Sequence, residues 1–224
     1  MGMMIQFDVN ALPARAYLAL PDSMKGPGVL LMHAWWGLNP FFKNLSDRLA
    51  GEGFVVMAPD YYHGAIAENI DQAQALSSKV DRKATNKLLN GSLEVLCSQS
   101  QVLSSQVGVI GFSLGCGFAL ILARSKPNNV VAVVLYYGTG GGKYQGVNAH
   151  FLGHFAEHDE WGAHSQKVSV LKDRLSQANG EVKFYTYPGT GHWFCEEDRR
   201  GAYDKQAAEK AWERTIGFLH ANLG

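Results

Sequence analysis

Apolar and polar residues alternate at the start of the chain and then give way to continuous apolar runs. Ile5, Phe7 and Val9 alternate with polar residues, and a second extended run covers 14–20, which predicts an antiparallel pair of edge strands. The later runs are short and almost wholly apolar, and they lie at 29–32, 54–58, 107–110, 130–137, 150–156 and from 182 onward. Such runs are typical of strands covered on both faces of a parallel sheet.

Helical patterns separate these runs. Asn39 is placed to cap a helix that Pro40 opens, with Phe41, Leu45 and Leu49 on one face. The other helical segments are two between about 67 and 100, one from 117 to 123, one over 163–178 and one over 203–222. The alternation predicts an α/β fold with a mostly parallel central sheet and helices on both faces. Because no repeat or linker interrupts it, we predict one domain over 1–224.

Composition narrows the class of protein. The 224 residues carry 20 Lys plus Arg and 20 Asp plus Glu, so the formal net charge is zero. A nucleic-acid or membrane-surface partner calls for a basic excess, and a membrane span calls for a longer apolar run than any here. The first residues lack a signal-peptide pattern and the three cysteines lack C-x-x-C spacing, which predicts a cytoplasmic chain without disulfides.

The most informative stretch is residues 107–120, VGVIGFSLGCGFAL. An apolar strand pattern meets G-x-S-x-G at Ser113 and continues as a helix pattern, which is the arrangement of a nucleophile elbow. The tight turn raises the hydroxyl above the sheet and requires neighbours without a Cβ at Gly111 and Gly115. The helix start also directs free N–H groups toward an oxyanion formed at Ser113.

Two further residues follow predicted strands at the same edge of the sheet. Asp159 comes after the 150–156 run and His192 after the run from 182, giving the chain order Ser, Asp, His. His192 is suited to take the Ser113 proton, and Asp159 to orient the imidazole. The backbone N–H groups of Leu114 and Trp35 are the expected oxyanion donors.

Several segments together resemble the dienelactone hydrolase family of α/β-hydrolases over nearly the whole chain. They are HAWWGLNPF at 33–41, APDYYHG at 58–64, GFSLGCG at 111–117, and the HDEW and PGTGHWF segments around Asp159 and His192. The resemblance implies an α/β-hydrolase fold with little or no lid. It also implies catalytic positions at Ser113, Asp159 and His192, and oxyanion donors at Leu114 and Trp35.

Three differences separate this chain from the enzymes that give the family its name. Those enzymes use cysteine where this chain has Ser113, and they carry a glutamate where it has Ala34. An arginine that holds the substrate carboxylate is matched here by Glu196, whose negative charge would repel an anionic lactone. The differences predict a serine enzyme that prefers neutral substrates.

Other candidate residues support smaller roles. Trp36 and Trp193 lie next to the oxyanion turn and the base, so they are candidates for substrate binding, with ordinary packing as the alternative. The histidines at 150, 154, 158 and 164 lack a cysteine to complete a zinc site, and we predict no metal and no cofactor. Cys116 is expected to be a small buried residue rather than a second nucleophile.

The sequence therefore predicts a hydrolase that cleaves a small carboxylic ester or lactone through a Ser113 acyl-enzyme. Two alternatives stay open. The same site suits an acyltransferase or a thioester or amide hydrolase, and the fold alone suits a binding protein without turnover. The expected partner is a small molecule, with no nucleic acid and no membrane, and the sequence leaves the oligomeric state open.

Overall fold

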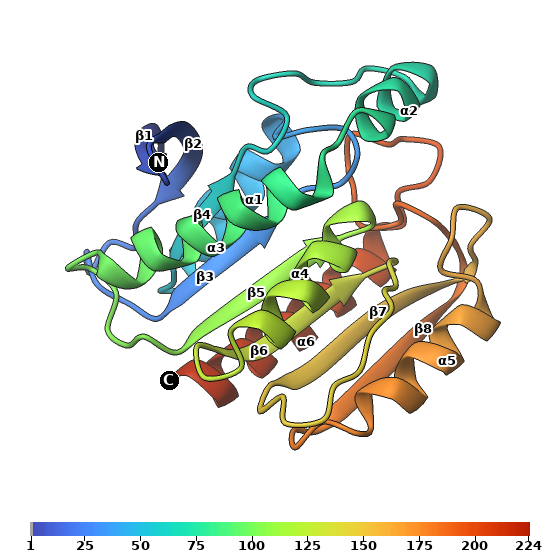
Figure 1. Ribbon diagram of the computed structural model, residues 1–224. Helices are drawn as coiled ribbons and strands as arrows, with labels where there is room; N and C mark the ends of the chain where they lie inside the picture. Colours follow the sequence, from blue (N-terminus) through green and yellow to red (C-terminus); the bar gives the residue numbers. More distant parts are fainter. Residues whose placement is uncertain (1) are drawn as a thin grey trace. The chain divides into compact units, whose positions relative to one another are not determined.

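A computed structural model describes residues 2–224 of the chain (Figure 1). The chain forms two compact units, with the boundary between Val107 and Gly108. After the first two strands helices are interspersed between strands, with one pair of consecutive helices in the first unit and one pair of consecutive strands in the second as the exceptions to strict alternation, and the predicted α/β class is confirmed. The single domain over 1–224 stays a prediction.

The first unit contains four strands and three helices. The strands are β1 (Met3–Val9), β2 (Leu12–Ala19), β3 (Gly28–Met32) and β4 (Val55–Pro59), in the spatial order β1-β2-β4-β3. β2 pairs antiparallel with β1 and with β4, whereas β3 and β4 are parallel, which confirms the predicted antiparallel edge pair. The helices are α1 (Pro40–Gly51), α2 (Ile70–Ser78) and α3 (Arg82–Ser98).

Helices cover both faces of β3 and β4 in this unit, with α1 on one side and α3 on the other (Figure 1). The α1 start follows the predicted capping, because Asn39 Oδ1 accepts a hydrogen bond from the Phe42 N–H at 3.2 Å and Pro40 is the first helical residue. Every residue of β3 and of β4 is buried, as their continuous apolar runs predict.

The second unit also combines strands with helices, but its strands follow one another in chain order. Its strands are β5 (Val107–Phe112), β6 (Val130–Tyr136), β7 (His150–His158) and β8 (Val182–Gly191), in the order β5-β6-β7-β8. β6, β7 and β8 pair in parallel. The helices are α4 (Leu114–Ser125), α5 (Ser165–Leu175) and α6 (Lys205–Leu223). In Figure 1 α4 and α6 lie on opposite faces of the strands, and both helices contact β6, so β6 is covered on both faces.

The strand ends differ from the predicted ones at two places that position the site. β7 extends to His158, two residues beyond the predicted end, and β8 continues through Pro188 to Gly191. A register irregularity lies between Ala156 and His158, and the last pair joins His158 to Gly191. A bulge of this kind re-aims the residues that follow it, and Asp159 and His192 are those residues.

Candidate active site

Ser113 lies between β5 and α4 in the sharp turn that the sequence predicts. Its φ of 49° and ψ of −110° fall in the left-handed half of backbone space, which a non-glycine residue adopts only when its surroundings enforce it. The Ser113 N–H donates to the Tyr136 carbonyl at 2.9 Å, which ties the turn to β6. A Cβ on Gly111 would approach the Cys116 backbone to 2.8 Å, so the expected crowding before the serine is present.

The three residues predicted from separate strand ends lie in hydrogen-bonding contact. Ser113 Oγ is 2.9 Å from His192 Nε2, and His192 Nδ1 is 2.6 Å from Asp159 Oδ2. The His192 and Asp159 side chains are 3% and 0% exposed. With Nδ1–H donating to the carboxylate, Nε2 is left as an acceptor for the Ser113 hydroxyl. This arrangement can move a proton from the hydroxyl to the imidazole.

Strand register explains why Asp159 and His192 meet. Each follows one member of the final β7–β8 pair, His158 and Gly191, so the two residues leave neighbouring strands side by side. The sequence places both at strand ends, but it does not show that these ends are paired.

Both carboxylate oxygens of Asp159 take part in hydrogen bonds. Oδ2 faces His192, while Oδ1 accepts hydrogen bonds from the backbone N–H groups of Trp161, Gly162 and Ala163 at 2.9, 3.1 and 3.2 Å. Burial alone would raise the pKa of the Asp159 carboxyl, but the hydrogen bonds from His192 and the backbone hold that pKa below its usual value. The carboxylate is therefore charged and fixed in direction beside the imidazole.

Aromatic rings contact the His192 imidazole. The Trp193 ring stands edge-on to it, with centroids 5.1 Å apart and planes at 89°, and Tyr137 lies 4.9 Å away at 57°. Trp193 also contacts the partly exposed Trp161 at 5.1 Å between centroids. The predicted substrate-binding residue Trp193 thus lies directly against the proposed base, and Tyr137 is a neighbour that the sequence reasoning missed.

The predicted oxyanion donors lie in different units. Leu114 is the first residue of α4, so its N–H has no acceptor within the helix and remains available to a ligand. Trp35 and Trp36 belong to the first unit, in the turn after β3, where their rings meet at 5.4 Å and 70°. Trp36 is only 2% exposed, which favours the packing alternative for it. The oxyanion role of Trp35 stays a prediction.

Glu196 differs from its expected role as a charge that repels an anionic substrate. It is 0% exposed, and its Oε1 accepts a hydrogen bond from the Tyr137 hydroxyl at 2.9 Å. Burial raises the pKa of Glu196 to about 8, so the carboxyl is neutral at neutral pH. Glu196 therefore does not present a charge to solvent, because the turn after Trp193 directs this side chain inward.

Other polar residues of this unit have structural roles. His154 is wholly buried, with Nδ1 2.8 Å from the Tyr187 hydroxyl and Nε2 3.0 Å from Thr215 Oγ1, and burial lowers its pKa to about 3. The buried Cys116 thiol donates to the Gly111 carbonyl at 3.0 Å, and burial raises its pKa. Within residues 2–224, no three His, Cys, Asp or Glu side chains are grouped as a metal site. In the same residues, none of the helices has the length and apolar content that a bilayer crossing demands.

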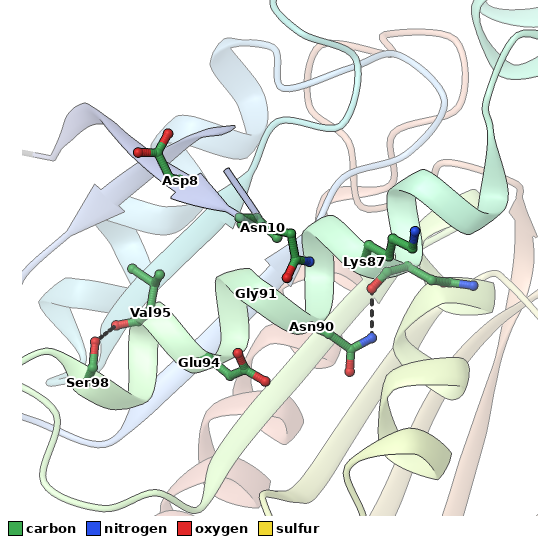
Figure 2. Close-up of a pocket in the computed structure, with 10 residues that line it drawn as sticks. Asp8, Asn10, Lys87, Asn90, Gly91, Glu94, Val95 and Ser98 are labelled. Carbon is green, nitrogen blue, oxygen red and sulfur yellow. Dashed lines mark hydrogen bonds between the residues drawn. The ribbon is translucent and has the colours of Figure 1, made fainter. Parts of the chain in front are cut away.

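Cavities of several hundred cubic ångströms lie within the first unit. One, of about 540 Å³, runs along α3 beside the β1–β2 turn, with Asp8, Asn10 and Glu94 among its lining residues (Figure 2). Another, of about 820 Å³, lies between that turn, the residues after β4 and the start of α3, and shares Val9, Asn10 and Lys87 with the first. Neither is lined by a residue of the Ser113–His192–Asp159 group, so we assign them no part in its chemistry.

Comparisons with known proteins show what this chain is similar to as a whole. The model of the "Dienelactone hydrolase family" matches residues 14–223. "Protein usf" of Aquifex pyrophilus is 33% identical over 232 residues, and a "Putative carboxymethylenebutenolidase" of Aquifex aeolicus is 32% identical over 237, each covering 100% of both chains. A crystal structure titled "Putative Dienelactone Hydrolase" from Klebsiella pneumoniae superimposes with a TM-score of 0.84 at 22% identity, covering 98% of this chain and 99% of its own. The α/β-hydrolase fold expected from the sequence is thereby confirmed.

Proposed function

The chain belongs to the dienelactone hydrolase family, and from that premise we propose that it cleaves small carboxylic esters or lactones through an acyl-enzyme on Ser113. The class of enzyme, a hydrolase, agrees with the prediction from the sequence. The single observation that carries the proposal is the continuous hydrogen-bond chain from Ser113 through His192 to Asp159.

The proposed reaction has two steps. In the first, Ser113 Oγ attacks the carbonyl carbon while its proton passes to His192 Nε2, and the imidazolium then protonates the leaving oxygen as the ester C–O bond breaks. In the second, His192 takes a proton from water, the resulting oxygen nucleophile attacks the acyl carbon, and Ser113 Oγ leaves with the proton from the imidazolium. Asp159 stabilises the imidazolium in both steps without itself taking the proton.

Oxyanion stabilisation is the second requirement of this chemistry. The Leu114 N–H at the start of α4 is one proposed donor, supported by the positive end of the helix dipole. The Trp35 N–H is the other proposed donor, by its position in the family motif at 33–41. Trp193, lying against His192, is the proposed wall of the substrate site.

Neutral esters and lactones are the proposed substrates. The family arginine that holds a substrate carboxylate is replaced by Glu196, and Glu196 is buried and bonded to Tyr137. Position 196 therefore offers an anionic substrate no cation to bind. The preference for neutral substrates is therefore expected because the family's positive charge is missing at position 196, and not because Glu196 repels an anion. We further propose that the protein works in the cytoplasm, because its sequence has only three cysteines and they lack C-x-x-C spacing.

The test is removal of the nucleophile. Ser113→Ala should abolish hydrolysis of p-nitrophenyl acetate and labelling by a fluorophosphonate probe, because both need the activated hydroxyl. Ser176→Ala, which removes an exposed serine at the end of α5, is the matched control and should leave both signals intact. Full activity in Ser113→Ala would refute the proposal, and an unlabelled wild-type protein would favour a binding protein without turnover.

A further inference from the structure

Tyr137 is held in an unusual conformation beside the proposed base. It follows the last residue of β6 with a φ of 39°, and its side chain is 0% exposed. Its N–H donates to the His154 carbonyl at 2.8 Å, and its ring packs against Phe112 and Phe194 with centroids 5.8 and 5.5 Å away. A strained residue persists only where its surroundings enforce it, and such residues gather at functional sites.

Glu196 supplies the polar anchor for this ring. Its N–H donates to the Trp193 carbonyl at 2.8 Å, and its own carbonyl accepts from the Arg199 N–H at 2.9 Å, so a turn holds the residue. The Tyr137 hydroxyl donates to Oε1, while Oε2 has no hydrogen-bond partner among residues 2–224. Burying a carboxyl group costs free energy that an apolar side chain would avoid. Packing alone therefore does not explain this residue.

The His192 imidazole is constrained at both of its nitrogens and by two neighbouring aromatic rings. Its two nitrogens meet Ser113 and Asp159, and these hydrogen bonds fix the ring edges. Tyr137 and Trp193 contact the ring itself. A swing of the whole Tyr137 side chain about χ1 would give the imidazole room to tilt, and the hydrogen bond to Glu196 opposes that swing because it anchors the hydroxyl end.

We infer that Glu196, acting through Tyr137, is a positioning residue for the imidazole of His192. The inference rests on the proposed function for its effect on turnover. The family resemblance leads one to expect a substrate contact at position 196. The inference instead gives Glu196 a role in holding His192, the proposed base, in position. The relevant property of Glu196 is its hydrogen-bond acceptor, since a buried neutral carboxyl and a carboxamide both offer a carbonyl oxygen.

Three variants separate the acceptor from the side-chain volume and the ring. Glu196→Gln keeps an acceptor for the Tyr137 hydroxyl, Glu196→Leu removes it at similar size, and Tyr137→Phe removes the hydroxyl but keeps the ring. Glu197→Leu, at the exposed neighbouring glutamate, is the matched control. Circular dichroism checks folding, and Tyr137→Phe, which removes one oxygen, keeps the test decisive if Glu196→Leu does not fold.

Kinetics with p-nitrophenyl acetate give the first readout. Glu196→Leu and Tyr137→Phe should each lower kcat about tenfold with KM nearly unchanged, the size expected for one lost hydrogen bond. The kcat of the double variant should equal that of the less active single variant, because both changes break the same hydrogen bond. Glu196→Gln should retain most of the wild-type kcat, and Glu197→Leu all of it. Wild-type kcat in folded Glu196→Leu and Tyr137→Phe, or equal losses in the Gln and Leu variants, would overturn the inference.

The NMR signal of the His192 Nδ1 proton gives a readout that does not need turnover. A hydrogen bond of 2.6 Å to Asp159 should shift this proton far downfield in the wild type, in Glu196→Gln and in Glu197→Leu. The signal should broaden or move in Glu196→Leu and Tyr137→Phe. If the protein hydrolyses no ester, the proposed function fails while this signal still decides the positioning role. An identical signal in all variants would refute it.

Discussion

Replacing Glu196 by glutamine should change how the stability of the fold depends on pH. The carboxyl is wholly buried, and burial raises its pKa from an ordinary 4.5 to about 8, with Asp198 acting in the same direction and Arg199 and the Tyr137 hydrogen bond opposing it. Below pH 4.5 the group is protonated in both the folded and the unfolded chain. Between about 4.5 and 8 only the unfolded chain ionises, so the fold loses stability as pH rises through this window. Above it the loss stops growing.

The size of the effect follows from the shift in pKa. Each pKa unit corresponds to about 1.4 kcal/mol, so between pH 5 and pH 8 the Glu196 contribution should change by roughly 3 kcal/mol. Glutamine cannot ionise and lacks this term. The glutamine NH₂ group would occupy the place of Oε2, which has no hydrogen-bond partner among residues 2–224. The unpaired amide N–H groups should lower the free energy of unfolding by about 1–3 kcal/mol at every pH. The slope against pH, not stability at one pH, therefore isolates the carboxyl.

Urea unfolding followed by both tryptophan fluorescence and circular dichroism measures this slope. The free energy of unfolding of the wild type minus that of Glu196→Gln should fall by roughly 3 kcal/mol from pH 5 to pH 8. Glu197→Gln, at the exposed neighbour, should follow the wild type at every pH. Parallel pH dependences for wild type and Glu196→Gln would show that Glu196 ionises normally and would refute the reasoning.

The remaining predictions concern the catalytic group and the turn that presents it. Asp159→Asn should lower kcat by about three orders of magnitude in steady-state assays, because an amide cannot stabilise the imidazolium; a loss below about tenfold would contradict the role. Gly111→Ala should destabilise the fold by at least about 2 kcal/mol in urea unfolding, because its Cβ would lie 2.8 Å from the Cys116 backbone. Gly217→Ala, in open space on α6, should instead gain about 0.5–1 kcal/mol.

The periodicity of the sequence predicts most elements because it records which faces are buried. The continuous apolar runs become strands covered on both sides, and Asn39 with Pro40 marks the start of α1. The positions of the proposed catalytic residues are predictable for a related reason. Strand ends that carry polar residues in the order Ser, Asp, His leave few other interpretations in an α/β chain.

Burial of a polar side chain after a strand cannot be predicted in the same way. Glu196 and Glu197 are adjacent and chemically alike, yet one is 0% exposed and the other faces solvent. One cause of the difference is the turn that begins at Trp193, where the φ of Trp193 is 68° and no local sequence pattern indicates it. The other is the hydrogen bond from the Tyr137 phenol, which lies 59 positions earlier in the chain. The β7–β8 bulge is likewise a property of the pair of strands and not of either one. Sequence periodicity therefore predicts which residues reach the sheet edge, whereas long-range contacts decide which neighbours hold His192 in place.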